Sequence, residues 1–232
     1  MLKSSSFNLK FPIFVIAICL VPLAVRAQDN PDSATNRRES SSVLERILSL
    51  FKSRQNSLIT RGDVCFVSPG SVGEQLVWSD RPLFIMDGEI PEARIEIHSP
   101  TTNYNYERDG QIVWTTDLAP NTTTLAYTGE PLQPGFVYDW VFSKSEKTYE
   151  PIAFKLMSQP EREQIAGELN TLETELQQQG ATTEDIAIAK ADFFVSRQLL
   201  SDALQQLHSV EQPSSTLVSE IADVKKYLCT DS

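Results

Sequence analysis

A turn that leads directly into an alternating strand constrains the fold more than any other stretch of the chain. The turn has the pattern L-x-P-G-x-x-Y over residues 132–138. After it, Tyr138, Trp140 and Phe142 share one face of a strand, and the residues between them share the other. A rigid Pro-Gly turn, followed by a tyrosine whose hydroxyl bonds to nearby backbone, is a way for a chain to cross between two packed sheets.

Eight short β-strands are predicted between residues 61 and 157, with turns rich in glycine and proline between them. They cover residues 64–68, 83–86, 93–98, 103–107, 112–116, 122–127, 136–143 and 152–157. Most of them alternate; Ile95 and Ile97 share one face of their strand, and charged residues take the other. This pattern predicts two packed antiparallel sheets with a solvated outer face. Together with the corner, it resembles fibronectin type III and other immunoglobulin-like domains, which implies a β-sandwich but no particular activity.

After residue 157 the hydrophobic period changes from two to three and four, which predicts helices. Residues 158–161 read Ser-Gln-Pro-Glu, a capping box with proline in the first turn, and Gly180 is predicted to end that helix. Thr182 opens a second helical region with a break near residues 197–199, and a last helix follows Pro213.

The second helical region resembles a tetratricopeptide repeat over about one unit. Small and aromatic residues fall at the spacing of that motif: Ala187, Ala191, Phe194, Ala203, Leu207 and Val210. The early Trp and Leu positions of the motif are Ala187 and Lys190 here, so its usual start is missing. A lone repeat cannot bury its own faces, and a small helical bundle accounts for the same spacing.

The predicted fold class is therefore α+β, an immunoglobulin-like antiparallel β-sandwich followed by a small α-helical bundle. The sandwich covers residues 61–157 and the helical domain, partly like a tetratricopeptide repeat, covers 158–232. Residues 28–60 form a polar linker with a short amphipathic helix near residues 43–51. That helix either packs on the domain behind it or docks on a partner or a bilayer surface.

Residues 1–27 have the order of a secretory signal peptide. Lys3 and Lys10 precede an apolar run over residues 11–25, and Val25-Arg26-Ala27 forms a cleavage site before Gln28. The alternative is a membrane anchor, but the apolar run is shorter than the roughly 20 residues that a span needs. We expect a secreted or periplasmic protein with no stable membrane span after cleavage.

The charge of the chain excludes several kinds of partner. The formal net charge is −11, and the first 27 residues carry three bases and no acid, so their removal leaves −11 − 3 = −14. Nucleic-acid binding depends on clustered Lys and Arg, so no nucleic acid is expected as a partner. The same charge disfavours docking on an anionic membrane.

Two cysteines remain in the predicted mature chain, Cys65 and Cys229. Export to an oxidising compartment favours a disulfide between them. The alternative is two unrelated buried thiols.

No residue constellation identifies a reaction, so the protein is predicted not to be an enzyme and to need no cofactor or metal. The only histidines, His98 and His208, have no second ligand at metal-site spacing. Cys65 with His98 is the one nucleophile–base pair that the sequence allows, which leaves a hydrolase-like enzyme as an alternative. Four acids near the second strand are interpreted as dispersed surface carboxylates: Asp80, Asp87, Glu89 and Glu92.

The sequence thus predicts a secreted or envelope interaction module, with the sandwich as platform and the helices as the surface for a protein partner. A carbohydrate-binding module is the second alternative, because aromatic residues on a sandwich stack on sugars. Tyr104 and Tyr106 are the candidates for such an exposed binding surface.

From residue 62 onward the chain resembles a family of secreted cyanobacterial proteins of unassigned function. The resemblance rests on D-V-C-F-V-S-P-G at 63–70, V-W-S-D-R-P-L-F at 77–84, the L-x-P-G-x-x-Y corner and A-D-F-F at 191–194. It implies export and a class of organism, and it implies nothing about a substrate.

Overall fold

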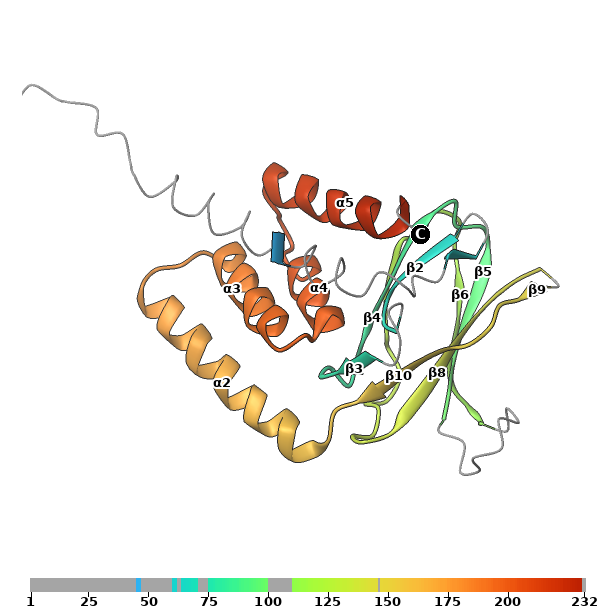
Figure 1. Cartoon of the computed structure of the whole chain (residues 1–232), viewed down its shortest axis with the longest axis horizontal. Coiled ribbons are helices and arrows are strands. Elements are labelled where there is room, and N and C mark those ends of the chain that lie inside the picture. The colour runs from blue at the N-terminus through green and yellow to red at the C-terminus, as the bar shows by residue number, and fades with distance from the viewer. Residues whose placement is uncertain are drawn as a thin grey trace, which may run out of the picture. The chain divides into compact units, whose positions relative to one another are not determined.

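The computed structural model describes residues 45–46, 60–61, 64–70, 75–99, 110–145 and 147–230. Within these ranges the fold is α+β, with two open sheets followed by four helices (Figure 1). The predicted signal peptide, most of the predicted helix at 43–51, and Tyr104 and Tyr106 lie outside the described residues.

The first sheet contains four strands in the order β1-β2-β4-β7, and all neighbours in it are antiparallel. These strands are β1 (Thr60–Arg61), β2 (Val64–Ser68), β4 (Leu83–Gly88) and β7 (Thr124–Ala126).

The second sheet has the order β3-β10-β8-β5-β6, and β9 extends the pairing of β8. Its strands are β3 (Gln75–Val77), β5 (Ala93–His98), β6 (Ile112–Leu118), β8 (Val137–Lys144), β9 (Lys147–Thr148) and β10 (Ile152–Leu156). Strand β3 runs parallel to β10, so this sheet is mixed and the prediction of purely antiparallel sheets is wrong here. Three residues are too few for an alternating pattern, which is why the sequence did not reveal β3.

Aromatic side chains fill the space between the two sheets. Trp140 of β8 is fully buried, and its ring meets Phe66 of β2 edge-on with centroids 5.2 Å apart and Phe84 of β4 at 5.1 Å. Phe142 lies 5.2 Å from Phe66 on the same side of β8. Each such ring buries a large apolar area, so this layer is the main core of the β region.

The corner predicted from the L-x-P-G-x-x-Y pattern is confirmed. The backbone N–H of Gln133 donates to the Tyr138 hydroxyl at 2.8 Å, and the N–H of Gly135 donates to the carbonyl of Leu156 at 3.0 Å. Gly135 has a φ of 85°, a conformation that favours glycine. Burial raises the pKa of Tyr138, so the hydroxyl stays protonated and holds the turn to the start of β8.

Four helices follow the strands: α2 (Gln159–Gln178), α3 (Thr183–Ser196), α4 (Leu200–His208) and α5 (Ser215–Thr230). The capping box of α2 forms between Ser158 and Glu161 as predicted. Gly180, with φ of 78°, ends that helix, and the break near residues 197–199 separates α3 from α4. The buried residues of α2 are Ile165 and Leu169, both in its first half.

The helices cover the outer face of the first sheet. Cys65 and Val67 of β2 and Ile85 of β4 belong to one buried cluster with Phe194 of α3 and Leu204 of α4. Figure 1 shows β2 and β4 with the helices on one side and β5, β6 and β8 of the second sheet on the other. The predicted solvated outer face is therefore wrong for the first sheet. Its strands are buried on both faces because the helices form a third layer.

The expected disulfide is present and joins β2 to the last turns of α5. Cys65 and Cys229 are bonded, with their Cα atoms 5.7 Å apart and a sequence separation of 164. The bond fixes α5 against the covered face of the first sheet.

Candidate functional site

A groove of about 440 Å³ lies between the C-terminal half of α2, the first turns of α3 and the segment that joins α4 to α5. It is in the size range of pockets that hold ligands. The lining combines acids, amides, hydroxyls and a few apolar side chains: Glu173, Gln177, Thr183, Ile186, Ala187, Lys190, Gln206, Ser209, Val210, Glu211 and Gln212.

The lining of this groove contains apolar side chains and an ion pair between α2 and α3. Ile186 and Ala187 are buried, and Val210 is half-buried. Lys190 of α3 donates from Nζ to a carboxylate oxygen of Glu173 on α2 at 2.7 Å. The Lys190 side chain is only 19% exposed, so this pair is better shielded than an ordinary surface ion pair and holds the two walls at a fixed separation.

A second set of hydrogen bonds joins residues that are next to the groove lining in sequence. The carboxylate of Glu184 in the first turn of α3 accepts from the backbone N–H and from the hydroxyl of Ser214, both at 2.7 Å. Thr182 and Asp185 form the capping box that starts α3. These bonds tie the start of α3 to the segment before α5, so three sides of the groove are held together.

The lining of the groove is rich in hydrogen-bonding side chains. Its single ammonium group is paired with Glu173, and none of the groups in the lining is a histidine or a cysteine. Amides and hydroxyls beside apolar side chains suit a ligand that has both peptide N–H and C=O groups and an apolar side chain.

A buried aspartate joins the helices that form the groove to the second sheet. Asp202 of α4 is 1% exposed, and its two carboxylate oxygens accept from the backbone N–H groups of Trp78 and Ser79, each at 2.8 Å. Burial raises the pKa of Asp202 to about 6, although the two backbone donors and the charge of Arg162 act in the opposite direction.

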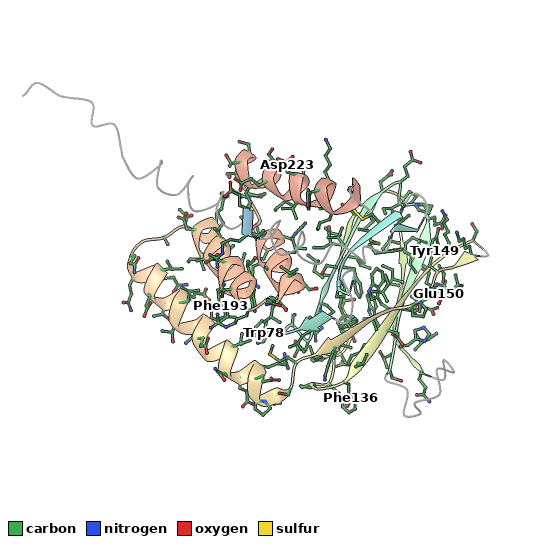
Figure 2. All side chains as sticks on the ribbon, in the orientation of Figure 1. Trp78, Phe136, Tyr149, Glu150, Phe193 and Asp223 are labelled. Atoms are coloured by element: carbon green, nitrogen blue, oxygen red, sulfur yellow. A yellow bond between two sulfur atoms is a disulfide. The ribbon has the colours of Figure 1, made fainter. Side chains whose placement is uncertain are left out.

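Arg162 of α2 completes this junction. Its Nε donates to the carbonyl of Trp78 at 2.8 Å, and the indole N–H of Trp78 donates to the carbonyl of Arg162 at 3.1 Å. The guanidinium also pairs with Asp80 at 2.9 Å. The Trp78 ring packs on Phe194 with centroids 5.5 Å apart, so the segment after β3 inserts between α2, α3 and α4 (Figure 2).

The nucleophile–base pair allowed by the sequence does not form in this structure. Cys65 is in the disulfide, on the covered face of the first sheet. His98 lies on the outer face of the second sheet, where its Nε2 is 3.2 Å from a carboxylate oxygen of Glu96. His208 lies in α4 with Nδ1 2.9 Å from the carbonyl of Leu204, and burial lowers its pKa.

Within the described ranges, no group of His, Cys, Asp and Glu side chains is arranged to hold a metal ion. Asp80, one of the four clustered acids, is paired with Arg162. Among the helices that the structure describes, none combines the length and apolarity that a membrane crossing requires.

Two tryptophans of the β region pack in its interior and offer no sugar platform. Trp140 is fully buried, and Trp114 stacks on Phe84 with centroids 5.9 Å apart. Phe136, before β8, is 47% exposed and extends away from the sheet (Figure 2).

Neither the groove nor the role of Asp202 is predicted from the sequence. A groove arises from the packing of separate helices, and no local pattern encodes it. Asp202 did leave a signal, because it is an acid between Leu200 and Ala203 in the apolar stripe of a short helix. A charge at such a position is rarely buried without a partner, so it points to a specific hydrogen-bonded contact.

Comparisons with protein families, with curated proteins and with solved structures give no match for this chain. The resemblance to secreted cyanobacterial proteins gains no support from these comparisons.

Proposed function

We propose that this protein is an exported, non-enzymatic interaction module whose helical groove binds an extended segment of a protein partner. The observation that carries the proposal is a groove lined by polar and apolar side chains, with the Lys190–Glu173 ion pair in its lining and the Glu184–Ser214 hydrogen bonds next to it in sequence. A preformed site loses little conformational entropy on binding, so it can bind a flexible segment.

The strand order supports an immunoglobulin-like relationship for the β region. After β1 and β2 of the first sheet, the chain crosses to the second sheet with β3, which runs parallel to β10. The tyrosine corner at Tyr138 is a further feature of such sandwiches. In the helical region, the buried Ala187, Ala191, Phe194 and Ala203 support packing of α3 on α4 like that of a tetratricopeptide repeat.

Export is supported by the Cys65–Cys229 disulfide, because disulfides persist mainly in oxidising compartments. The acidic charge of the chain favours a protein over nucleic acid as the partner. We place the protein in the periplasm or outside the cell.

The proposal is tested by photo-crosslinking in the native envelope. A benzophenone amino acid at Gln177, an exposed residue of the groove wall, is expected to form a covalent adduct with a protein partner. The matched control carries the probe at Glu175, which is exposed on the same helix but outside the groove lining. Digestion of the adduct identifies the partner segment.

The substitution Lys190→Ala removes the ion pair between α2 and α3, so it is expected to reduce the adduct at position 177. Equal adducts at positions 175 and 177, or an adduct that Lys190→Ala leaves unchanged, would place the partner surface elsewhere.

A further inference from the structure

The second sheet has one long edge with no strand beside it in the described part of the chain. Strand β6 pairs with β5 on one side only, and it contains seven residues. The other edge strands are much shorter, with two residues in β1 and three each in β3 and β7. A short edge strand protects a sheet against unwanted pairing with another strand. Strand β6 is too long to have this protection.

The residue composition of β6 allows it to pair with a further strand. The strand reads Ile-Val-Trp-Thr-Thr-Asp-Leu and contains no proline or lysine. Ile112 and Val113 are 52% and 45% exposed. A register shift affects only the start of the strand, and residues 114–118 pair regularly with β5.

The one charge in β6 is compensated within the same molecule. Asp117 accepts from Nε of Arg94 on β5 at 2.9 Å. Unpaired charges on an edge are another natural barrier to strand addition. In β6 this barrier is weakened, because the carboxylate lies beside a guanidinium.

We propose that β6 is a dimerisation edge, on which β6 of a second copy pairs antiparallel in a register centred on Thr115. The strand is self-complementary in this register. Thr115 lies opposite its own counterpart, and Trp114 of each copy lies opposite Thr116 of the other. Pairs of threonines and pairs of an aromatic with a β-branched residue are both favourable across strands.

The same register keeps the acidic groups apart. Asp117 lies opposite Val113 of the second copy, so the two Asp117 residues are about 13 Å apart along the strand. The net charge of −11 on each chain opposes association at long range, but it is screened over about 8 Å at physiological salt. Dimerisation is therefore expected to strengthen as salt is added.

The test begins with sedimentation equilibrium of the oxidised full chain at increasing protein concentration. A monomer–dimer equilibrium is expected. Thr115→Lys places two lysines opposite each other on an exposed face and should weaken association by about tenfold or more. The matched control is Val218→Lys on α5, where the native residue is 52% exposed, and it should leave the equilibrium unchanged. Thermal unfolding verifies that both variants are folded.

The register is tested by crosslinking. Opposite residues of antiparallel strands have Cα atoms about 4.5–5.5 Å apart, which a disulfide can span. Thr115→Cys is expected to give a covalent dimer on oxidation, while Asp117→Cys, on the same face of the same strand, gives none. A protein that is monomeric at every concentration overturns the proposal. So does a dimer that Thr115→Lys does not weaken, or equal crosslinking at both positions.

Discussion

The outer faces of the two sheets differ in what covers them. On the first sheet, Val67 and Ile85 point outward and are 1% and 0% exposed, because α3, α4 and α5 pack on them. On the second sheet, Leu76 and Val137 also point outward, yet they are 38% and 39% exposed. These two residues flank Lys155 of β10 in one row across three strands.

The difference shows that alternation in a strand does not decide whether its outer face meets water. The covered face belongs to strands that are apolar at nearly every position, such as β2, which is buried throughout. The open face belongs to strands such as β5, where buried and less buried residues alternate. A strand that is buried on both faces therefore indicates a third layer packed on its sheet.

The largest expected effect comes from truncation on the covered face. Ile85→Ala should lower the free energy of unfolding by about 2–5 kcal/mol, because it leaves a cavity between the first sheet and the helices. Val137→Ala on the open face should change it by about 0.5 kcal/mol or less. Urea unfolding measures both. Equal losses would mean that the two faces are equally covered.

Removal of the disulfide tests how much the covalent bond between α5 and the first sheet contributes to stability. Replacing both Cys65 and Cys229 with Ser should cost about 2–5 kcal/mol, since the bond closes a loop of 164 residues in the unfolded chain. The comparison is made with the oxidised wild type in the same denaturant series. An unchanged unfolding midpoint would show that α5 needs no covalent tie to the sheet.

Asp202→Ala tests the hydrogen-bonded contact between α4 and the segment after β3. Two backbone N–H groups lose their acceptors, so we expect a loss of about 1–3 kcal/mol. Asp202→Asn retains one acceptor oxygen and should lose less. The control is Asp223→Ala on the exposed side of α5 (Figure 2), for which the expected change is about 0.5 kcal/mol or less. A loss at position 223 equal to that at position 202 would contradict the role of the junction.

The smallest effect is a pH dependence of the junction. The folded pKa of Asp202 is about 6 and its ordinary value is 3.8, so the folded state holds the extra proton more tightly. The stability of the wild type relative to Asp202→Asn should therefore rise as the pH falls from above 6 to below 3.8. Urea midpoints of the two proteins across this range measure it. A relative stability that falls on acidification would mean that the hydrogen bonds keep the pKa below its ordinary value.

Much of the secondary structure could be predicted because it depends on local chemistry. The tyrosine corner, the capping boxes at Ser158 and Thr182, and the break between α3 and α4 each follow from residues within a few positions of one another. The Cys65–Cys229 pair could be predicted for a different reason, since only two cysteines follow the predicted signal peptide.

The features that the sequence did not predict depend on contacts between distant segments. Strand β3 forms only because β10 lies beside it, and Asp202 is buried because the chain after β3 inserts against α4. The groove likewise requires α2, α3 and the α4–α5 segment together. Such contacts join residues far apart in the chain. Hydrophobic periodicity and residue propensity describe neighbours in sequence, so they do not predict these contacts.

The central claim is that the helices and the first sheet form one cooperative unit. Hydrogen exchange of the oxidised protein, followed by mass spectrometry, tests it directly. We predict that peptides from α3 and α4 exchange through the same global opening as peptides from β2 and β8, and that denaturant accelerates all of them together. Helical peptides that exchange much faster than those of β2 would contradict the claim and show that the helices open independently of the sheet.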